Sequence, residues 1–416
     1  MRLTSLGKVD PEIEQFIKNE LLRQKETLML IPSENYASPA VLEVQSSVLS
    51  NKYAEGYPGE RYYQGCRWVD EVESLAIQRA KELFGAEHVN VQVHSGTGAN
   101  IAVYQALLKP GDKILSLNLT QGGHLSHGKE GSLPYNFYTI ANYGLDRKSE
   151  CFDMEKIRKK AKKEKPNLII VGASAYPRKI EFKPWREIAD EVGAYLMVDA
   201  AHTIGLIAAK VHPDPVEYAD VVTATTQKTL RGPRGGFILC RKEFAHKIDE
   251  AVFPGTQGGP FMHLIAAKAV CFKEAMGPSF RDYQSRVISN CQTLAQVLLE
   301  EGFRLVTGGT DNHLILVDLQ SKGITGKEAA LILEEAGIVV NKNCIPFDLL
   351  PPTVTSGIRL GTPALTTRGM KEEEMKTIGR WISQILHNPE KISLREKIKK
   401  KVIELSRSFP IYEDFA

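Results

Sequence analysis

Seven short apolar runs, rich in β-branched residues, recur between residues 89 and 240, and helical stretches lie between several of them. Strands that are apolar along their whole length are buried on both faces, as happens when helices cover both sides of a mostly parallel sheet. The pattern therefore predicts an α/β fold around a seven-stranded sheet. The expected strands are Val89–Val93, Lys113–Asn118, Asn136–Ile140, Asn167–Ala173, Ala194–Asp199, Val221–Thr225 and Gly236–Cys240.

Helical and smaller α+β patterns flank this region. A helix over Gln15–Leu28 precedes a short arm, and Asp70–Phe84 reads as an amphipathic helix that ends at Gly85. Three regions are expected: an N-terminal helix and arm (1–30), a large domain (31–280) and a small C-terminal domain (281–416). After helices between His263 and Gly302, the small domain is expected to contain strands His313–Leu319, Ile338–Lys342 and Gly357–Gly361, helix Gly326–Ala336 and a helix from Lys371.

The composition excludes several classes of protein. A hydrophobic fraction of 43%, a charged fraction of 25% and a net charge of +3 are typical of a globular domain and do not indicate a nucleic-acid partner. Apolar runs are too short for a membrane span, and a secretory signal pattern is missing. The six cysteines lack metal-ligand spacing, so we expect reduced thiols, no metal and a soluble cytoplasmic protein.

An acidic residue ends one predicted strand, and a lysine follows the next. Asp199 closes the run from Tyr195, and Lys228 follows Val221–Thr225 in a segment of threonines and glycines. Burial lowers the pKa of an amine and leaves it able to form a Schiff base, while a carboxylate can keep a pyridine nitrogen protonated. Alone, the lysine is ambiguous and the aspartate could cap a loop. Together they predict a pyridoxal phosphate site.

The loop His94–Asn100 consists mostly of small residues and lies between a strand and the expected helix Ile101–Leu108. Small residues let backbone N–H groups approach an anion, and the N-terminus of a helix favours phosphate. A plain capped turn is the alternative. The presence of Asp199 and Lys228 favours a phosphate-binding loop.

Several polar residues have both a structural and a functional interpretation. His202 is either a core histidine or a hydrogen-bond partner of cofactor or substrate. His124, exposed between glycines, can stack on an aromatic ring, whereas His127 is interpreted as structural. Arg359 lies inside an apolar strand and must pair with an anion, either a buried carboxylate or the carboxylate of a substrate.

The stretch Asn51–Tyr63 is dense in tyrosine and glycine. Aromatic clusters of this kind usually pack in a core or an interface. Glu55, however, lies among phenols on a glycine-hinged loop, where an acid/base group would be positioned.

Taken together, these motifs make the chain similar to the serine hydroxymethyltransferase family, which has the type I fold of pyridoxal phosphate enzymes. The similarity extends from about residue 10 to residue 385. The matching segments are Ser33–Asn35, Asn51–Tyr63, His94–Gly96, Gly122–Leu125, Gly172–Arg178, the Asp199/His202 pair, Lys228–Gly236, Gln257–Pro260, Asp311–His313, Asn341–Asn343 and the strand of Arg359.

The resemblance implies roles for residues around the cofactor. Lys228 would form the Schiff base, Asp199 would face the pyridine nitrogen and His124 would stack on the ring. Further cofactor contacts are implied for Ser174 and His202 at the 3-oxygen, for Thr225, and, at the phosphate, for Ser95, Gly96, Tyr53, Gly258 and Gly259.

The resemblance also implies how the substrates bind. Arg359 with Ser33 would bind the amino-acid carboxylate, and Glu55, with Tyr63 beside the substrate, would handle protons. Tetrahydrofolate would be contacted by Glu55, Tyr62, Leu119, Gly123, Leu125 and Asn343. Since Tyr53, Glu55, Tyr62 and Tyr63, like Gly258 and Gly259, would serve the neighbouring subunit, an obligate homodimer or a dimer of dimers with shared active sites is implied.

The chain departs from the family pattern near the cofactor. Gln227 replaces a histidine before the lysine, and Ala200 replaces a methionine after the aspartate. These changes remove bulk or charge and could admit an amino acid substituted at Cα. Further departures are Thr97-Gly98, Thr120-Gln121 and Lys129–Tyr135.

The leading hypothesis is a pyridoxal phosphate enzyme that moves a one-carbon unit between serine, or a close analogue, and tetrahydrofolate by retro-aldol cleavage of the Cα–Cβ bond. A folate-independent aldolase or transaldolase is the nearest alternative. A catalytically silent scaffold is a third, and the presence of Lys228, Asp199, Glu55 and Arg359 argues against it.

Overall fold

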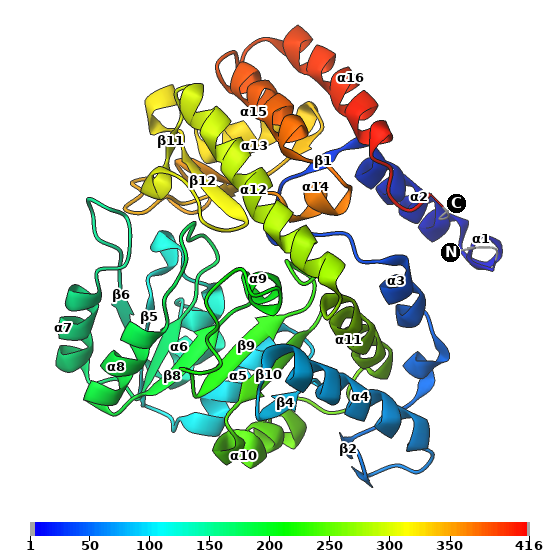
Figure 1. Ribbon diagram of the computed structural model, residues 1–416, viewed down its shortest axis with the longest axis vertical. Helices are drawn as coiled ribbons and strands as arrows, with labels where there is room; N and C mark the ends of the chain where they lie inside the picture. The colour runs from blue at the N-terminus through cyan, green and yellow to red at the C-terminus, as the bar shows by residue number, and fades with distance from the viewer. Residues whose placement is uncertain (1–4, 414–416) are drawn as a thin grey trace. The chain divides into compact units, whose positions relative to one another are not determined.

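The computed structural model describes residues 5–413, which form two compact units (Figure 1). One unit is Tyr36–Ser285, and the other combines the chain up to Asn35 with the chain from Arg286 onward. The N-terminal segment belongs with the C-terminal part because strand β1 (Leu28–Met29) pairs with β13 (Ile338–Val339). Arg368 strengthens this link by donating hydrogen bonds to the carbonyls of Gln24, Lys25 and Thr27.

A seven-stranded sheet forms the centre of the Tyr36–Ser285 unit. Its strand order is β4-β10-β9-β8-β7-β5-β6, and β10 runs antiparallel to both neighbours while the other pairs within the sheet are parallel. The predicted fold class is confirmed. The strands are β4 (His88–Asn90), β5 (Lys113–Leu117), β6 (Thr139–Tyr143), β7 (Leu168–Val171), β8 (Tyr195–Asp199), β9 (Val221–Thr225) and β10 (Gly236–Cys240).

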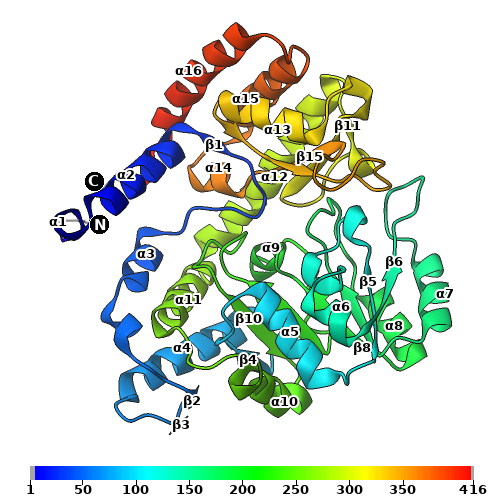
Figure 2. The same cartoon turned by 180° about the vertical axis from the view of Figure 1, so that it is seen from behind.

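Helices cover both faces of this sheet. Along β7, Ile169 and Val171 face one core cluster and Leu168 and Ile170 face another, as the alternation of a strand requires. Figure 2 shows α5 in front of the strands. The first cluster includes residues of α4 (Arg67–Phe84), α7 (Met154–Glu164), α8 (Lys183–Val192), α9 (Ile204–Ala208) and α11 (Met262–Ala275), and the second includes residues of α5 (Gly96–Leu107) and α10 (Ala245–Glu250).

The strand predicted over Asn136–Ile140 is wrong in its first half. Helix α6 (Leu133–Phe137) occupies that part, and β6 begins only at Thr139. Pro134 stands in the first turn of α6, where a proline costs no hydrogen bond and favours the helical φ angle. Because the segment is apolar throughout, its sequence pattern does not show where the helix ends and the strand begins.

The other unit contains an antiparallel four-stranded sheet in the order β11-β12-β15-β14. Its strands are β11 (Arg304–Leu305), β12 (Leu314–Asp318), β14 (Asn341–Asn343) and β15 (Gly357–Gly361). The single strand predicted over Ile338–Lys342 is wrong, because β13 pairs with β1 and β14 pairs with β15 in a different sheet.

The remaining helices complete the two units. They are α1 (Leu6–Val9), α2 (Pro11–Glu26), α3 (Pro39–Gln45), α12 (Pro278–Glu300), α13 (Gly326–Glu335), α14 (Pro363–Thr367), α15 (Glu372–Leu386) and α16 (Ile392–Ser408), with the hairpin strands β2 (Gly56–Tyr57) and β3 (Glu60–Arg61). Among residues 5–413, no helix combines the length and the apolar composition that crossing a membrane requires.

Gly172, which follows β7, can be replaced only at a cost. Its φ is +152°, and a Cβ atom would lie 2.3 Å from the carbonyl oxygen of Asp199. Gly172→Ala should lower the free energy of unfolding by about 3 kcal/mol, measured by urea denaturation. Gly193→Ala is the matched control, because Gly193 has a φ of +67° but open space around it, and we expect a loss of about 1 kcal/mol. Equal losses would contradict this account of the contact with Asp199.

Candidate active site

The predicted lysine and aspartate lie at one edge of the large sheet. Asp199 is the last residue of β8 and pairs in register with Thr223 of the neighbouring parallel strand β9. Lys228 follows β9 by three residues, and its Nζ donates a hydrogen bond of 3.1 Å to Thr225 Oγ1. Since the carboxyl ends of parallel strands meet at the same edge of a sheet, the Asp199 carboxylate and the Lys228 amine both lie at that edge.

Asp199 accepts hydrogen bonds from three groups. His127 Nε2 lies 2.9 Å and Asn100 Nδ2 2.9 Å from Asp199 Oδ2, and the backbone N–H of Ala201 donates to Oδ1 at 3.0 Å. The Nδ1 of His127 accepts from the N–H of His124, so the tautomer with its proton on Nε2 satisfies both contacts. The carboxylate is thus fixed in position by donors alone.

These contacts determine the charge of Asp199. Burial raises its pKa, but the hydrogen bond and electrostatic attraction of His127, with smaller contributions from His124 and Asn100, outweigh burial, and the net pKa is well below the usual range. A depressed carboxyl pKa adds stability that is present above the unfolded pKa and is lost only as the pH falls through the folded value. Asp199 therefore remains ionised under physiological conditions.

A second layer of hydrogen bonds holds Asn100 and His124. Asn100 Oδ1 accepts from Thr223 Oγ1 at 2.6 Å, and its Nδ2 also donates to Ser126 Oγ at 2.8 Å. Ser126 Oγ in turn lies 2.7 Å from His124 Nδ1. A continuous polar chain thus joins the predicted stacking residue His124 to Asp199.

The loop before α5 lies against the end of β9. Ser95 is the N-cap of α5 and accepts a hydrogen bond from the N–H of Gly98. A Cβ on Gly96 would lie 2.6 Å from the Thr225 side chain, and one on Gly236 would lie 2.5 Å from the Ser95 carbonyl oxygen. Only glycines allow this approach, which brings the N-terminus of a twelve-residue helix beside the residue that contacts Lys228.

A buried lysine holds the chain that leads into this loop. Lys268 is 2% exposed, and its Nζ donates to the carbonyls of Val91 (2.6 Å), Val93 (3.0 Å) and Gly236 (2.7 Å). Burial lowers the pKa of Lys268 to about 7, although the charge of Glu73 opposes this effect. Its ammonium group joins the segment after β4 to the start of β10.

The loop of His124 lies against the segment after β7. The N–H of Ser174 donates to the carbonyl of Gly122 at 2.8 Å. A Cβ on Gly123 would lie 2.3 Å from the Leu117 carbonyl oxygen, so this loop needs glycine. His202 is buried and its carbonyl accepts from Thr229 Oγ1 at 2.9 Å. Ser174 and His202 are therefore held by the ends of neighbouring parallel strands.

Beside His124 lies a pocket of about 230 Å³. Leu119, His127 and Tyr135 contribute to its lining. The predicted folate position Leu125 is 52% exposed on the same loop. The pocket contains residues of both the predicted cofactor site and the predicted folate site.

A second group of predicted residues gathers around the β2–β3 hairpin. The Tyr53 and Tyr63 rings pack edge to face, with centroids 5.2 Å apart. A Cβ on Gly258 would lie 3.1 Å from Glu55 Oε1, and one on Gly259 would lie 3.1 Å from the Tyr53 ring. The charge of Glu55 raises the pKa of Tyr63. Gly258 and Tyr63 thus lie beside the Glu55 carboxylate, and Gly259 lies beside Tyr53.

The aromatic residues of this second group are open to solvent. Tyr53 is 56% exposed and Tyr62 is 74% exposed, even though the Tyr62 ring packs edge to face on Phe253. Exposed aromatic surface of this kind marks an interaction site.

Arg359, Ser33 and Asn343 belong to the other compact unit. Arg359 lies on β15 opposite Asn341, whose side-chain oxygen accepts from Nε at 3.2 Å. Burial lowers the pKa of its guanidinium to about 10, which leaves it charged at neutral pH. Ser33 follows Pro32, which packs against Gly361 of the same strand, and Asn343 pairs with Gly357.

His124, His127 and Asp199 are also a set that could bind a metal ion, since their ligand atoms lie within 4.8 Å of one another. The geometry assigns these atoms differently. His127 Nε2 donates to Asp199, and His124 Nδ1 accepts the N–H of Ser126. The proton on His127 Nε2 and the hydrogen bond accepted by His124 Nδ1 leave neither nitrogen with a free lone pair for a metal.

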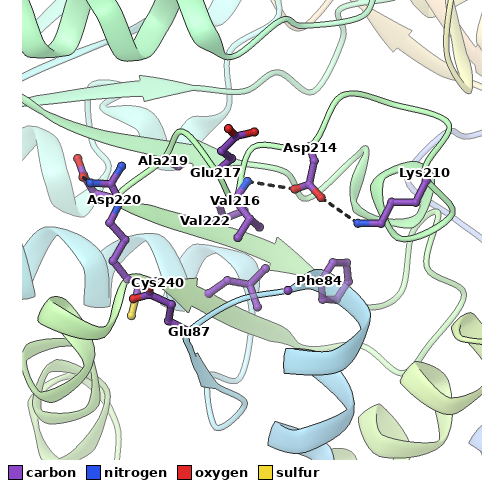
Figure 3. Close-up of a pocket in the computed structure, with 13 residues that line it drawn as sticks. Phe84, Glu87, Lys210, Asp214, Val216, Glu217, Ala219, Asp220, Val222 and Cys240 are labelled. Carbon is purple, nitrogen blue, oxygen red and sulfur yellow. Dashed lines mark hydrogen bonds and ion pairs between the residues drawn. The ribbon is translucent and has the colours of Figure 1, made fainter.

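A larger pocket, of about 460 Å³, lies elsewhere (Figure 3). It includes Asp220, which directly precedes β9, whereas Lys228 follows that strand. Its charged residues are largely paired, as in the ion pairs of Lys210 with Asp214 and of Arg241 with Asp220. The pocket is thus at the opposite end of β9 from the candidate active site.

Comparisons with known proteins decide the family. The family described as serine hydroxymethyltransferase matches residues 6–382. A serine hydroxymethyltransferase of Coprothermobacter proteolyticus is 56% identical over 417 residues, covering all of both chains. The chain belongs to the serine hydroxymethyltransferase family.

This membership confirms the predicted fold, cofactor and reaction. The chain is a pyridoxal phosphate-dependent transferase that interconverts serine and glycine with tetrahydrofolate as the one-carbon carrier. The alternative of a folate-independent aldolase is not favoured.

The residues at the edge of the sheet fit the cofactor of this family. The N-terminus of α5 and the close approach at Gly96 suit a phosphate, the Lys228 amine suits an aldehyde, and the ionised Asp199 suits a protonated ring nitrogen.

Sequence reasoning missed two members of this site. From the sequence alone, Asn100 is placed only at the end of the phosphate loop and His127 is interpreted as structural, yet both donate to Asp199. The available signal was position: Asn100 is a polar residue in the first turns of an apolar helix, and His127 follows His124 by three residues on a glycine-flanked loop.

Replacing His127 should impair catalysis through Asp199. His127→Leu removes the Nε2 donor and raises the pKa of the carboxyl group, so we expect kcat/KM for serine to fall about tenfold to a hundredfold. His246→Leu is the control, because His246 is exposed on α10 and pairs with Glu250. An unchanged kcat/KM in the His127 variant would show that Asp199 does not depend on this donor.

Replacing Lys268 should weaken cofactor binding. Lys268→Met leaves three buried carbonyls without their shared donor and loosens the entry to the phosphate loop, so the Kd for pyridoxal phosphate should rise about tenfold or more. Equilibrium dialysis of the apoenzyme measures this. Lys273→Met, at an exposed position of α11, should bind as the native protein does. Equal affinity in both variants would contradict the role of Lys268.

Proposed function

We propose that serine hydroxymethyl transfer in this chain depends on Asp199, Lys228 and the α5 N-terminus of one subunit and on Glu55 of another. The observation that carries this assignment is the buried, ionised Asp199, held by His127 and Asn100 one strand from Lys228.

Each group of the cofactor has a residue to bind it. Bound pyridoxal phosphate supplies an electron sink for the negative charge that develops at the substrate Cα when the Cα–Cβ bond breaks. Asp199 would accept a hydrogen bond from the protonated ring nitrogen, and Ser95 and Gly96 would bind the phosphate. His124 would stack on the ring, and Ser174, His202 and Thr225 would supply further contacts.

The substrate residues orient the amino acid and move its proton. Arg359, with Ser33, binds the carboxylate as a charged pair. Glu55 accepts the proton of the substrate hydroxyl as the Cα–Cβ bond breaks and returns it in the reverse direction. Tyr63, whose pKa Glu55 raises, stays protonated and donates to this carboxylate.

Tetrahydrofolate receives the one-carbon unit beside these groups. Leu119, Gly123 and Leu125 offer one side of its site, and the pocket of about 230 Å³ near Leu119 supports this placement. Tyr62 and Asn343 are the remaining proposed contacts.

A homodimer accounts for the exposed aromatic residues of the second group, around Glu55. Tyr53, Tyr62 and Tyr63 are exposed in the single chain, as is Trp68 at the start of α4. We infer that a second copy covers them and that Tyr53, Glu55, Gly258 and Gly259 complete its active site. The six cysteines are unpaired, which supports a reducing compartment such as the cytoplasm.

Mixing two inactive variants tests the shared site. Lys228→Ala and Glu55→Gln should each lose most serine turnover with tetrahydrofolate. Refolded together in equal amounts, half of the dimers are mixed and each mixed dimer has one intact site, so about a quarter of the native activity should return.

Recovery near zero, with mixed dimers shown by differently tagged chains, would contradict the contribution of Glu55 to the partner's site. A mixture of Lys228→Ala with Asp199→Ala is the control. Both residues belong to the same subunit's site, so each site of a mixed dimer carries one of the two substitutions and neither site is intact. Its recovery should be near zero, which shows that the return of activity in the first mixture requires residues from two subunits.

A further inference from the structure

A single arginine holds the backbone on both sides of Glu55. Arg61 Nη1 donates to the carbonyl of Ala54 at 2.8 Å and to the carbonyl of Gly56 at 2.7 Å. These are the two residues that flank Glu55 in the chain. The N–H of Tyr62 adds a hydrogen bond to the carbonyl of Glu55 itself, at 3.0 Å.

The other nitrogens of this guanidinium bind two carboxylates of helix α4. Arg61 Nε lies 2.8 Å from Asp70 Oδ1, and Nη2 lies 2.6 Å from Glu73 Oε2. The side chains of Arg61 and Glu73 are only 3% and 1% exposed. A buried ion pair is tolerated when its hydrogen-bonding groups are satisfied, and here each nitrogen of the fork has a partner.

Gln92 connects the same pair to the segment after β4. Its Nε2 donates to Glu73 Oε1 at 2.7 Å and to the carbonyl of Gly56 at 2.9 Å. Gly56 has a φ of +92°, and a Cβ there would lie 2.3 Å from the carbonyl oxygen of Glu60. The tight turn after Glu55 is therefore fixed from three directions by buried polar groups.

These contacts restrict the backbone on both sides of Glu55. Its Oε1 lies against Gly258, at 3.1 Å from the position of an added Cβ, and its charge raises the pKa of Tyr63. None of the atoms that hold the backbone belongs to the cofactor residues Lys228, Asp199 or Ser95. These hydrogen bonds therefore serve the loop that contains Glu55.

We propose that the buried Arg61–Glu73 ion pair is a positioning device that presents Glu55 for proton transfer. The inference rests on the proposed role of Glu55. A loop with glycines at both ends of its hairpin would sample many conformations, and an error of about 1 Å in a catalytic group can cost a hundredfold in rate. The guanidinium of Arg61 removes this conformational freedom of the loop before a partner or substrate binds.

The experiment is a double-mutant cycle on the holoenzyme with Arg61→Lys and Glu55→Gln. A lysine keeps the charge, but its single ammonium cannot contact two carbonyls and two carboxylates at once. Arg61→Lys should lower kcat for serine and tetrahydrofolate about tenfold to a hundredfold. KM for serine and the visible absorbance of the bound cofactor should change little, because Arg359, Lys228 and Asp199 are untouched.

In the Glu55→Gln background, Arg61→Lys should change kcat by less than about twofold, because a device that acts through Glu55 has nothing left to position. An equal loss in both backgrounds, a loss of cofactor absorbance, or an unchanged kcat would overturn the proposal. Arg407→Lys is the control, since Arg407 is exposed on α16 and its ion pair with Glu26 lies at the surface. It should leave every parameter unchanged.

Two further readouts separate the possible failures. If Arg61→Lys does not fold, Glu73→Gln, which keeps the shape of the side chain and removes its charge, is placed in the same cycle with the same expected result. If Glu55→Gln alone leaves kcat intact, the assignment of Glu55 is wrong and the inference is overturned with it. An active Arg61→Lys beside an inactive Glu55→Gln overturns only the positioning device.

Discussion

The active site depends on one buried carboxylate that stays ionised. Removing a carboxylate from water costs several kcal/mol, and Asp199 is stable there because His127, Asn100 and a backbone N–H donate to it. Further residues depend on this arrangement. Asn100 is held by Thr223 and Ser126, and Gly172 must lack a side chain because it lies close to the Asp199 carbonyl. A single charge thus constrains two strands, one helix and one loop.

Buried charges recur around the functional loops. Lys268 joins three carbonyls next to the phosphate loop, and Arg61 with Glu73 holds the loop of Glu55. Each has more hydrogen-bond partners than an exposed ion pair offers. Because backbone carbonyls are the main partners of these cations, their effect is to fix loop conformation, a role that an apolar side chain of equal size cannot take.

The sequence predicted the features that follow from strand periodicity. Continuous apolar strands imply a parallel sheet, and parallel strands bring their carboxyl ends together, so Asp199 and Lys228 could be paired without a structure. The ends of strands were harder to predict from the sequence. Asn136 and Phe137 lie in α6, and Ile338–Lys342 divides between two sheets. The positions of His127 and Asn100 in the sequence only mark them as unusual polar residues, because their contacts with Asp199 depend on how a loop and a helix pack. The cofactor itself was predicted correctly from the strand ends and from the family resemblance.

The most direct test is the protonation of the ring nitrogen of bound pyridoxal phosphate, read from its ¹⁵N chemical shift at mildly alkaline pH. The account predicts a protonated nitrogen in the native enzyme and an unprotonated one in Asp199→Ala, with an intermediate shift in His127→Leu. An unprotonated nitrogen in the native enzyme, or the same shift in all three proteins, would contradict it.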